Sequence, residues 1–367
     1  MGRIIFFIIF LLTVSSIYFG MHYYIYKRIV ANLLLSEQLA RYLQLLFFIG
    51  GLSFISGEIL SRRFSFSWLL MGGVFWMGIM AISFAVFLVR DILALMIPFS
   101  PRISTITALV VVSVMVAYSL FNAHQPPHLK KVEVKIKNLP ASFQGTVIIQ
   151  LSDLHLNGIK SEQWLQGIVE RVNKCQPDII VVTGDLIDRD LEKIKLYIPI
   201  LQQLKAKSGI FSIPGNHEYY AGIENYLSCI RACGMVDVSN KVMLIKEKLQ
   251  LAGLPDVTGK QYGYFQPALN KTLAACDPEK PLILITHAPL QFQEAVEGGV
   301  DFQISGHTHA GQIPPMDLIV RLIYKYPYGL SFYNSASIYT TCGTGTWGPP
   351  MRFSSRSEIV HFTLSPS

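Results

Sequence analysis

The sequence predicts two parts of different fold class: a bundle of four membrane-spanning helices, followed by an α/β domain that contains two sheets. Of its 367 residues, 51% are hydrophobic and only 15% are charged, which is too apolar for a single soluble globule. The apolar excess lies before residue 130, whereas strand-like and helix-like patterns alternate after it. The length suffices for about two domains. We predict a helical domain at 1–122, a linker at 123–131 and an α/β domain at 132–367.

Four long uncharged runs predict the membrane spans. They contain no Asp, Glu, Lys or Arg, and they cover residues 4–26, 42–57, 64–89 and 103–129. About 20 apolar residues cross the ~30 Å hydrocarbon core of a bilayer. We therefore predict spans at about 4–26, 39–60, 67–89 and 104–122. The first run lacks a small-residue cleavage site and precedes further spans, so it is not a signal peptide. The sequence predicts a multi-pass protein of the cell (inner) membrane.

The distribution of charge indicates which partners to expect. The net charge is +7, of which +5 belongs to residues 1–129 and +2 to the remainder. Because the basic residues flank the spans, nucleic acid is not an expected partner. With four spans the two termini share one side of the membrane. That side carries seven Lys and Arg residues near the spans against five on the other, which favours a cytoplasmic C-terminal domain. Five cysteines without framework spacing are compatible with a reducing compartment.

Periodic patterns after the linker predict the elements of the second domain. A helix with Ser161 as its N-cap is predicted to end at Cys175, and a second, over 191–206, to be bent by Pro199. Apolar and β-branched runs predict strands. They lie at 132–137, 146–151, 179–183, 210–214, 249–254, 282–286, 302–305, 337–341 and 358–364. Strand–helix–strand order followed by strand-rich sequence predicts a two-sheet sandwich flanked by helices, an α/β/β/α arrangement.

Five short polar motifs follow five of these predicted strands and hold five of the nine histidines. The motifs are Asp153-Leu154-His155, Gly184-Asp185-Leu186-Ile187-Asp188, Gly215-Asn216-His217-Glu218, the single His287, and Gly306-His307-Thr308-His309. Ligands bind at the carboxyl ends of strands in open α/β sheets, so we expect these side chains to converge. Carboxylates, an amide oxygen and imidazoles together suit Mn, Fe, Zn or Co. The donors are too many for one tetrahedral ion, which predicts a two-metal hydrolytic centre.

In these motifs the chain resembles the calcineurin-like metallophosphoesterases, which carry D-x-H, G-D-x-x-D, G-N-H-[DE], H and G-H-x-H in this order. The resemblance runs from about Lys130 to the C-terminus. Residues 306–312 and 342–353 are most similar to a bacterial membrane-anchored branch, which includes phosphodiesterases and lipid-precursor pyrophosphohydrolases. The resemblance implies the same two-sheet sandwich and two divalent ions, with Mn²⁺ as the first choice. Glu218 stands where the family more commonly has Asp, and Ala310 where it frequently has Gly.

The resemblance also assigns ligands to each ion. One ion would be held by Asp153, His155, Asp185 and His309. The other would be held by Asp185, Asn216, His287 and His307. Asp185 is the natural bridge, because a carboxylate offers lone pairs to two cations. We expect His307 and His309, two residues apart, to point to the same face of an extended segment.

Four residues are expected to contact the substrate or to support a residue that does. The resemblance makes His217 the catalytic histidine, which contacts the phosphoryl oxygens or protonates the leaving group, and Asn216 a substrate contact. Asp188 is the expected partner of His217, because a carboxylate raises the pKa of an imidazole and orients its ring; a helix N-cap is the alternative role. Arg352, in a Gly/Pro-rich turn, is a candidate to bind phosphate with two hydrogen bonds or to form a structural salt bridge.

A further stretch, residues 314–335, is expected to influence substrate choice. It places apolar residues on one helical face, with Arg321 and Lys325 on another. Such a stretch suits a membrane interface, and a cap packed over the domain core is the alternative. The sequence predicts an integral-membrane phosphoesterase that hydrolyses a phosphodiester or pyrophosphate bond in a small-molecule or lipid-linked substrate. A membrane sensor or scaffold that uses the fold only for binding, and a broad phosphomonoesterase with soluble substrates, are the alternatives.

Overall fold

The computed structural model describes residues 2–61, 67–157, 160–188, 191–264 and 266–367. The chain divides into two compact units, which we describe one at a time. The helical unit contains Met1–Ala123, Ile313–Pro315 and Gly348–Phe353. The α/β unit contains His124–Gln312, Met316–Trp347 and Ser354–Ser367.

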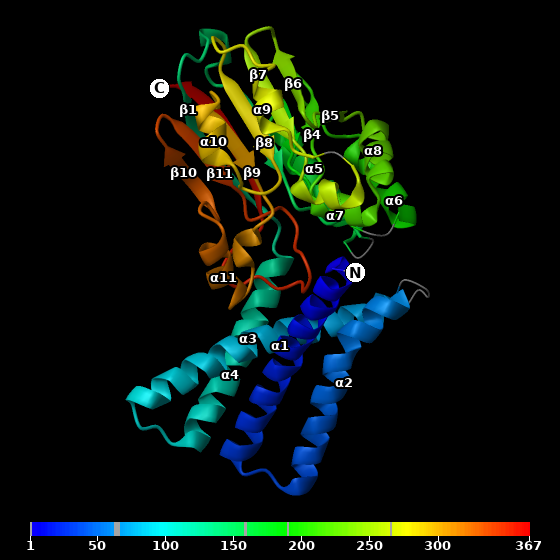
Figure 1. Cartoon of the computed structure of the whole chain (residues 1–367), viewed down its shortest axis with the longest axis vertical. Helices are drawn as coiled ribbons and strands as arrows, with labels where there is room; N and C mark the ends of the chain where they lie inside the picture. The colour runs from blue at the N-terminus through cyan, green and yellow to red at the C-terminus, as the bar shows by residue number, and fades with distance from the viewer. Residues whose placement is uncertain (1, 62–66, 158–159, 189–190, 265) are drawn as a thin grey trace. The chain divides into compact units, whose positions relative to one another are not determined.

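Four helices make up most of the helical unit (Figure 1): α1 (Gly2–Leu33), α2 (Glu37–Ser61), α3 (Ser67–Met96) and α4 (Pro101–His124). Within the described residues, three segments are long and apolar enough to cross a membrane: Glu37–Leu60, Trp68–Met96 and Pro101–His124. They confirm the second, third and fourth predicted spans as apolar helices. The first predicted span lies in α1, where most side chains of the first ten residues fall outside the described part of the chain. That span stays a prediction.

Two short segments from late in the chain complete the helical unit. Ile313 and Met351 are buried in one cluster with apolar side chains of α3 and α4. Arg352 is fully buried; its backbone N–H donates to Ser119 O (2.9 Å), and Asn122 Nδ2 donates to Arg352 O (2.9 Å). The helical unit therefore has a core to which distant sequence contributes.

The α/β unit contains two six-stranded sheets. The first has the order β1 (His128–Ile136), β12 (Glu358–Pro366), β2 (Val147–Leu151), β3 (Ile179–Val182), β4 (Ile210–Ser212), β5 (Val236–Asp237). The second has the order β10 (Gly329–Tyr333), β11 (Ala336–Thr340), β9 (Phe302–Ser305), β8 (Leu282–Thr286), β7 (Leu249–Leu254), β6 (Lys241–Ile245). Strands β2 to β5 run parallel in the first sheet, as do β11, β9, β8 and β7 in the second.

Helices cover the outer faces of both sheets, and the inner faces share one apolar core (Figure 1). On the first sheet these are α5 (Glu162–Lys174), α6 (Leu191–Leu201), α7 (Asn216–Ala221) and α8 (Ile223–Ala232); on the second, α9 (Leu269–Leu273) and α10 (Phe292–Glu297). A helix α11 (Met316–Ile323) and three short 3₁₀ turns, η1 (Ala141–Phe143), η2 (Val257–Tyr262) and η3 (His309–Gly311), complete the unit. The two-sheet α/β domain that the sequence predicts is present.

The helices and strands predicted for this unit are present, with small differences at their ends. The Ser161 hydroxyl caps α5 by accepting from Trp164 N, and Cys175 follows the last helical residue. The helix α6 ends at Leu201, five residues before the predicted end. The strands β5, β6 and β10 are additions that the sequence analysis did not foresee.

Candidate metal centre

The polar motifs lie in the loops that follow the parallel strands of both sheets, at the carboxyl ends of these strands. In the first sheet Leu151 pairs with Val182 and Val182 with Ser212, so the loops after β2, β3 and β4 begin at one level. In the second sheet Ile285 pairs with Ile304, so the loops after β8 and β9 do the same. Because the two sheets share a core, these five loops meet. All seven predicted ligands converge there: Asp153, His155, Asp185, Asn216, His287, His307 and His309.

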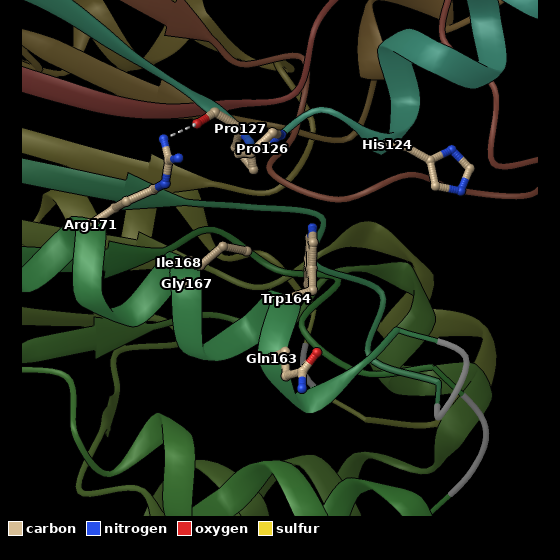
Figure 2. A pocket seen from close by; sticks show the side chains of 8 residues that line it. All are labelled: His124, Pro126, Pro127, Gln163, Trp164, Gly167, Ile168 and Arg171. Atoms are coloured by element: carbon tan, nitrogen blue, oxygen red, sulfur yellow. Dashed lines mark hydrogen bonds between the residues drawn. The ribbon is translucent and has the colours of Figure 1, made fainter.

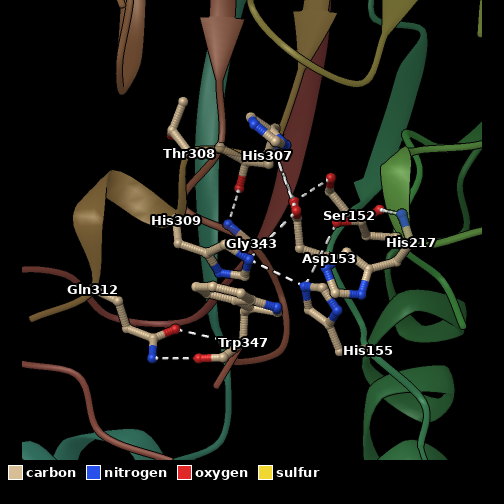
Figure 3. Close-up of polar contacts among 12 residues, drawn as sticks. Ser152, Asp153, His155, His217, His307, Thr308, His309, Gln312, Gly343 and Trp347 are labelled. Carbon is tan, nitrogen blue, oxygen red and sulfur yellow. Dashed lines mark hydrogen bonds and ion pairs between the residues drawn. The ribbon is translucent and has the colours of Figure 1, made fainter. Parts of the chain in front are cut away.

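One set of donors comes from the loops after β2 and β9 (Figure 3). It consists of Asp153, His155 and His309, whose donor atoms all lie within 4.8 Å of one another. The Nε2 atoms of His155 and His309 are 3.1 Å apart. His309 Nε2 lies 3.5 Å from Asp153 Oδ1. All three side chains are buried.

A second set comes from the loops after β3, β4, β8 and β9. His287 Nε2 lies 3.0 Å from both His307 Nδ1 and Asn216 Oδ1. His307 Nδ1 lies 3.1 Å from the same Asn216 oxygen. The amide group thus adds a neutral oxygen to two imidazoles and the Asp185 carboxylate.

Asp185 is common to both sets. Its Oδ2 atom lies 3.3 Å from His287 Nε2 in one set and 3.8 Å from His155 Nε2 in the other. Its Oδ1 atom accepts a hydrogen bond from the backbone N–H of His217 (2.9 Å). The carboxylate is therefore held in place by one oxygen and presents the other to both donor sets.

The chemistry of the donors fits cations at these positions. His287 Nδ1 faces the carbonyl of Thr183 at 2.8 Å, and a carbonyl only accepts, so Nδ1 carries the proton. In the neutral ring, the Nε2 lone pair then points at the oxygens of Asn216 and Asp185. Such a convergence of lone pairs is unfavourable until a cation or a proton occupies it.

The pKa values of His287 and Asp185 also favour positive charge at this position. Burial lowers the pKa of His287, but the charge of Asp185, the hydrogen bond to it and the charges of Asp153 and Asp256 together outweigh burial and hold this pKa well above its usual range. Burial in turn raises the pKa of Asp185, while His287, His217 and His155 hold it well below its usual range. The site therefore favours positive charge beside Asp185.

His217 and Asp188 lie beside the two donor sets. His217 Nδ1 is 2.6 Å from Asp188 Oδ1, the contact expected if Asp188 orients the ring. The same oxygen also lies 3.1 Å from His155 Nδ1, so Asp188 supports a predicted ligand as well. Burial lowers the pKa of His217, but the hydrogen bond to Asp188 and the negative charges of Asp185, Asp188 and Glu218 together outweigh burial and raise this pKa overall.

Left-handed backbone conformations position several donors. The φ angles lie between 48° and 73° at Asp153, His155, Asp185, His307 and His309. Residues other than Gly rarely adopt this conformation, which often marks functional sites. This backbone corrects one expectation. The segment that carries His307 and His309 is not extended: it turns into η3, so the two rings point into different donor sets.

Two motif glycines allow close approach of these loops. Gly184 has φ of 90°, and a Cβ atom there would lie 2.6 Å from both Gly215 N and His287 Nδ1. A Cβ atom on Gly306 would collide with Ser152 Oγ and Asp153 Oδ2. Larger residues at either position would push donors out of place.

Glu218 holds two of the donor loops together, a role that we did not predict from the sequence. Its side chain is fully buried and accepts from three backbone N–H groups, those of Gly215 (2.7 Å), Asp185 (2.9 Å) and Ile187 (3.0 Å). It thus joins the loop after β4 to the loop after β3. The signal was present, because a Glu at the third helical position commonly caps the start of a helix.

Aromatic and amide side chains adjoin His217 from other loops. The rings of Tyr220 and Trp347 lie 5.3 Å and 6.2 Å from the His217 ring. Trp347 is fixed by two hydrogen bonds with the side chain of Gln312, which Figure 3 shows as parallel dashed lines. Trp347 remains half exposed, so it borders the centre without closing it.

Two other features do not belong to the donor sets. Arg352 is buried within the helical unit, so its contact with phosphate stays a prediction. A cavity of about 160 Å³ lies between α5 and residues 124–127 (Figure 2). Trp164, Arg171 and Pro127 line it together with other residues, none of which belongs to the metal centre.

The comparisons with known proteins concern the same part of the chain. The model of the calcineurin-like phosphoesterase family matches residues 146–311, a range that contains every predicted metal ligand. An uncharacterized metallophosphoesterase of Helicobacter pylori is 36% identical over 242 residues, which are 65% of this chain and 64% of that protein. A transmembrane protein with a metallophosphoesterase domain, from Danio rerio, is 34% identical over 272 residues, 71% of this chain and 62% of that protein. The chain thus spans less than two thirds of the length of these two relatives.

A shorter relative is matched over most of its length. It is an uncharacterized metallophosphoesterase of Aquifex aeolicus, 32% identical over 240 residues, which are 64% of this chain and 91% of that protein. The five motifs occur in order, and their donors gather at one end of the two sheets. The chain belongs to the calcineurin-like metallophosphoesterase family.

Proposed function

We propose that the protein is a membrane-integral phosphoesterase with two divalent metal ions, which hydrolyses a phosphodiester or pyrophosphate bond. The observation that carries this proposal is the position of Asp185 Oδ2, within 3.3 Å and 3.8 Å of donors in two separate sets. A carboxylate shared in this way can bridge two ions, because it offers lone pairs to both. Three long apolar helices support the membrane location, as does the similarity to a protein named for both features.

Each ion would have its own ligands. Asp153, His155, Asp185 and His309 would hold one, and Asp185, Asn216, His287 and His307 the other. Two such ions make water a strong nucleophile at neutral pH and neutralise charge on the phosphoryl group. Mn²⁺ is our first choice, with Fe, Zn and Co as alternatives, because the donors mix oxygen and imidazole nitrogen.

The protein's own residues would position the substrate and move the proton. Asp188 holds Nδ1 of His217 (2.6 Å), which leaves Nε2 of that ring available to an oxygen of the substrate. His217 would protonate the leaving group as the bond breaks. Asn216 would contact the phosphoryl group without adding negative charge near an anionic substrate.

The substrate would be a phosphorylated small molecule or a lipid, and membrane lipids the other partners. Three apolar helices are more than one anchor needs, which favours a substrate that resides in the bilayer. The excess of basic residues on one side of the spans supports a catalytic domain in the cytoplasm, at the inner membrane.

The test is a substrate screen on the full chain, purified in detergent and supplied with Mn²⁺. Lipid pyrophosphates, glycerophosphodiesters, bis(p-nitrophenyl) phosphate and p-nitrophenyl phosphate would be compared, with bound metal measured by mass spectrometry. We expect two metal ions per chain and faster cleavage of diesters or pyrophosphates than of the monoester. Preferred cleavage of the monoester would indicate the broad phosphomonoesterase. Two bound metals without cleavage of any compound would favour the sensor or scaffold.

A further inference from the structure

The helix α11 is amphipathic, but its apolar side is exposed. Of its eight residues only Val320 is buried. The exposed fractions are 63% for Leu318, 87% for Leu322 and 66% for Ile323. By contrast, α5 buries its whole apolar face, as a helix on the surface of a soluble domain normally does. An apolar face left open on a short helix indicates that something else covers it.

The exposed side chains form one continuous edge. Leu318 and Leu322 are four residues apart, as are Ile319 and Ile323, so all four lie on the same side of the helix. This edge of the predicted stretch therefore does not pack over the domain core, since its side chains are exposed. The later part of the stretch does pack on the domain, where the rings of Tyr326 and Tyr333 contact that of Phe292.

Basic residues accompany the apolar edge. Arg321 is exposed within α11, and Lys325 follows one turn later. Lys325 Nζ donates to Gln293 Oε1 (2.9 Å) and lies over the rings of Tyr326 and Tyr333, which fixes the C-terminal end of the helix on the domain. Asp317 is the one carboxylate in the helix. Two cations beside an apolar edge match an anionic lipid surface.

The chain enters α11 directly from the unit that carries the apolar spans. Ile313–Pro315 belong to the helical unit, where Ile313 is buried with side chains of α3 and α4. Met316, the next residue after Pro315, begins α11. The exposed edge therefore follows directly in sequence on a segment that is anchored among the apolar helices. For this reason we expect lipid, and not another protein, to cover the edge.

We propose that α11 lies in the interface of the bilayer that the helices span. Its edge of Leu318, Leu322 and Ile323 inserts among the acyl chains, while Arg321 and Lys325 contact anionic headgroups. The consequence reaches the metal centre, because Tyr324 directly follows α11 and its ring lies 5.8 Å from the ring of His307. The helix would thus hold one side of the centre at the lipid surface. This inference goes beyond the proposed hydrolysis and does not depend on it.

Site-directed fluorescence tests the proposal without measuring activity. Leu322→Cys would be labelled with an environment-sensitive fluorophore in the full chain, reconstituted at one copy per phosphatidylcholine nanodisc with about one quarter phosphatidylglycerol, an anionic lipid. Nitroxide-labelled lipid quenches a label in the bilayer, and iodide quenches a label in water. Leu196→Cys is the matched control, an exposed helical leucine on α6 (56% exposed). The chain without an added cysteine gives the background from Cys175 and Cys276, the partly exposed native thiols.

We expect the label at position 322 to lose most of its emission to the nitroxide lipid and little to iodide, with the reverse at position 196. Ile323→Cys should repeat the result if Leu322→Cys folds poorly. Equal behaviour at positions 322 and 196 would overturn the proposal. Protection from both quenchers at position 322 would overturn it too, because protein rather than lipid would then cover the edge.

Discussion

The proposed metal centre needs the negative charge of Asp185. One oxygen of this carboxylate faces both donor sets, while the other accepts a hydrogen bond from the backbone. Asp185→Asn should therefore weaken both metal sites at once and lower turnover more than ~10²-fold, beyond the usual effect of residues that only support ligands. Metal content and hydrolysis of bis(p-nitrophenyl) phosphate, measured on the same preparation, check this.

A suitable control for Asp185→Asn is Asp178→Asn. Asp178 accepts from Val147 N (2.8 Å) and Lys207 Nζ (3.0 Å), outside the donor sets, and an amide oxygen can still accept from the backbone. The control should keep two metals and full turnover. If Asp185→Asn did the same, Asp185 would not bridge the ions.

His217 separates metal binding from proton transfer. Its side chain contacts Asp188 and is not needed in either donor set, so His217→Ala should keep both metals and lose turnover by ~10²–10⁴-fold. The loss should be smaller for p-nitrophenolate, a leaving group that needs little protonation. Loss of one metal would instead make His217 a ligand. A uniform loss for all leaving groups would leave it stabilising phosphoryl charge.

Asp188→Asn should give a mixed result, because the structure shows its oxygen in contact with both His217 and His155. Turnover should fall less than in His217→Ala, since the imidazole is misoriented and not removed. Metal affinity should also fall, by ~10–100-fold, as for other residues that orient a metal-ligating histidine. Metal titration of the two variants side by side distinguishes these effects. Unchanged affinity in Asp188→Asn would mean that the contact with His155 has no part in metal binding.

At the scale of single residues, chemistry could be predicted but conformation could not. The donor types and their places after apolar strands indicated that Asp153, His287 and the other predicted ligands would converge at one end of the two sheets. The left-handed backbone at His307 and His309 could not be read in this way, because side-chain type alone does not determine φ. As a result the two rings point into different donor sets, contrary to the prediction of one shared face.

At the scale of elements, buried strands and capped helices were the predictable part. The strand β3 is apolar at all four positions, and Ser161 marks the start of α5. The strand β10 lies at a sheet edge with alternate side chains exposed, so its sequence lacks the buried pattern that identified the others. The helix α11 was ambiguous for a related reason: an amphipathic pattern shows that one face is apolar but not what covers it.

The junction of α7 with the loop after β3 depends on Glu218. Glu218→Ala would leave three buried N–H groups without an acceptor, each worth ~1–3 kcal/mol. We expect the free energy of unfolding to fall by roughly 3 kcal/mol, which for a domain of this size lowers Tm by roughly 6–12 °C. Thermal unfolding of the full chain in detergent, followed by tryptophan fluorescence without added metal, measures this.

The matched control for Glu218→Ala is Glu224→Ala on α8, whose side chain is exposed. It should leave Tm within a degree or two of the unaltered chain, as surface substitutions usually do. A similar small shift for Glu218→Ala would show that water replaces the carboxylate as acceptor for the three N–H groups.

At the scale of the whole molecule, the sequence contains no mark of the two late segments that complete the helical unit. Gly348–Phe353 is short and rich in Gly and Pro, which predicts an exposed turn. The structure instead buries Arg352 and Met351 fully. This segment is too short to show the periodic spacing of apolar residues that marks a buried face, so its burial could not be predicted.

This burial predicts a difference between the full chain and a fragment of residues 124–367. The fragment keeps β1 but lacks Ser119 and Asn122, the hydrogen-bond partners of the Arg352 backbone. Trypsin should therefore cleave after Arg352 in the fragment much faster than in the full chain. Cleavage after the exposed Lys246 is the internal control and should be equal in both. Equal protection of Arg352 would show that the segment packs without the helices.

The membrane topology is the remaining property of the whole chain that the helices predict. With four crossings, Ser36, between α1 and α2, and Ser100, between α3 and α4, share one side. Gly2 and Ser365 share the other, which we expect to be the cytoplasm. Single cysteines at these four positions, in a chain with Cys175 and Cys276 replaced by Ser, can be labelled in intact and permeabilised cells.

Labelling of Ser36 and Ser365 from the same side would contradict crossing by α2, α3 and α4. Labelling of Gly2 together with Ser36 would have a narrower meaning: α1 does not cross, and the protein has three spans. The position of Gly2 therefore tests the first predicted span, which the described residues do not confirm, while Ser365 decides which compartment the metal centre faces.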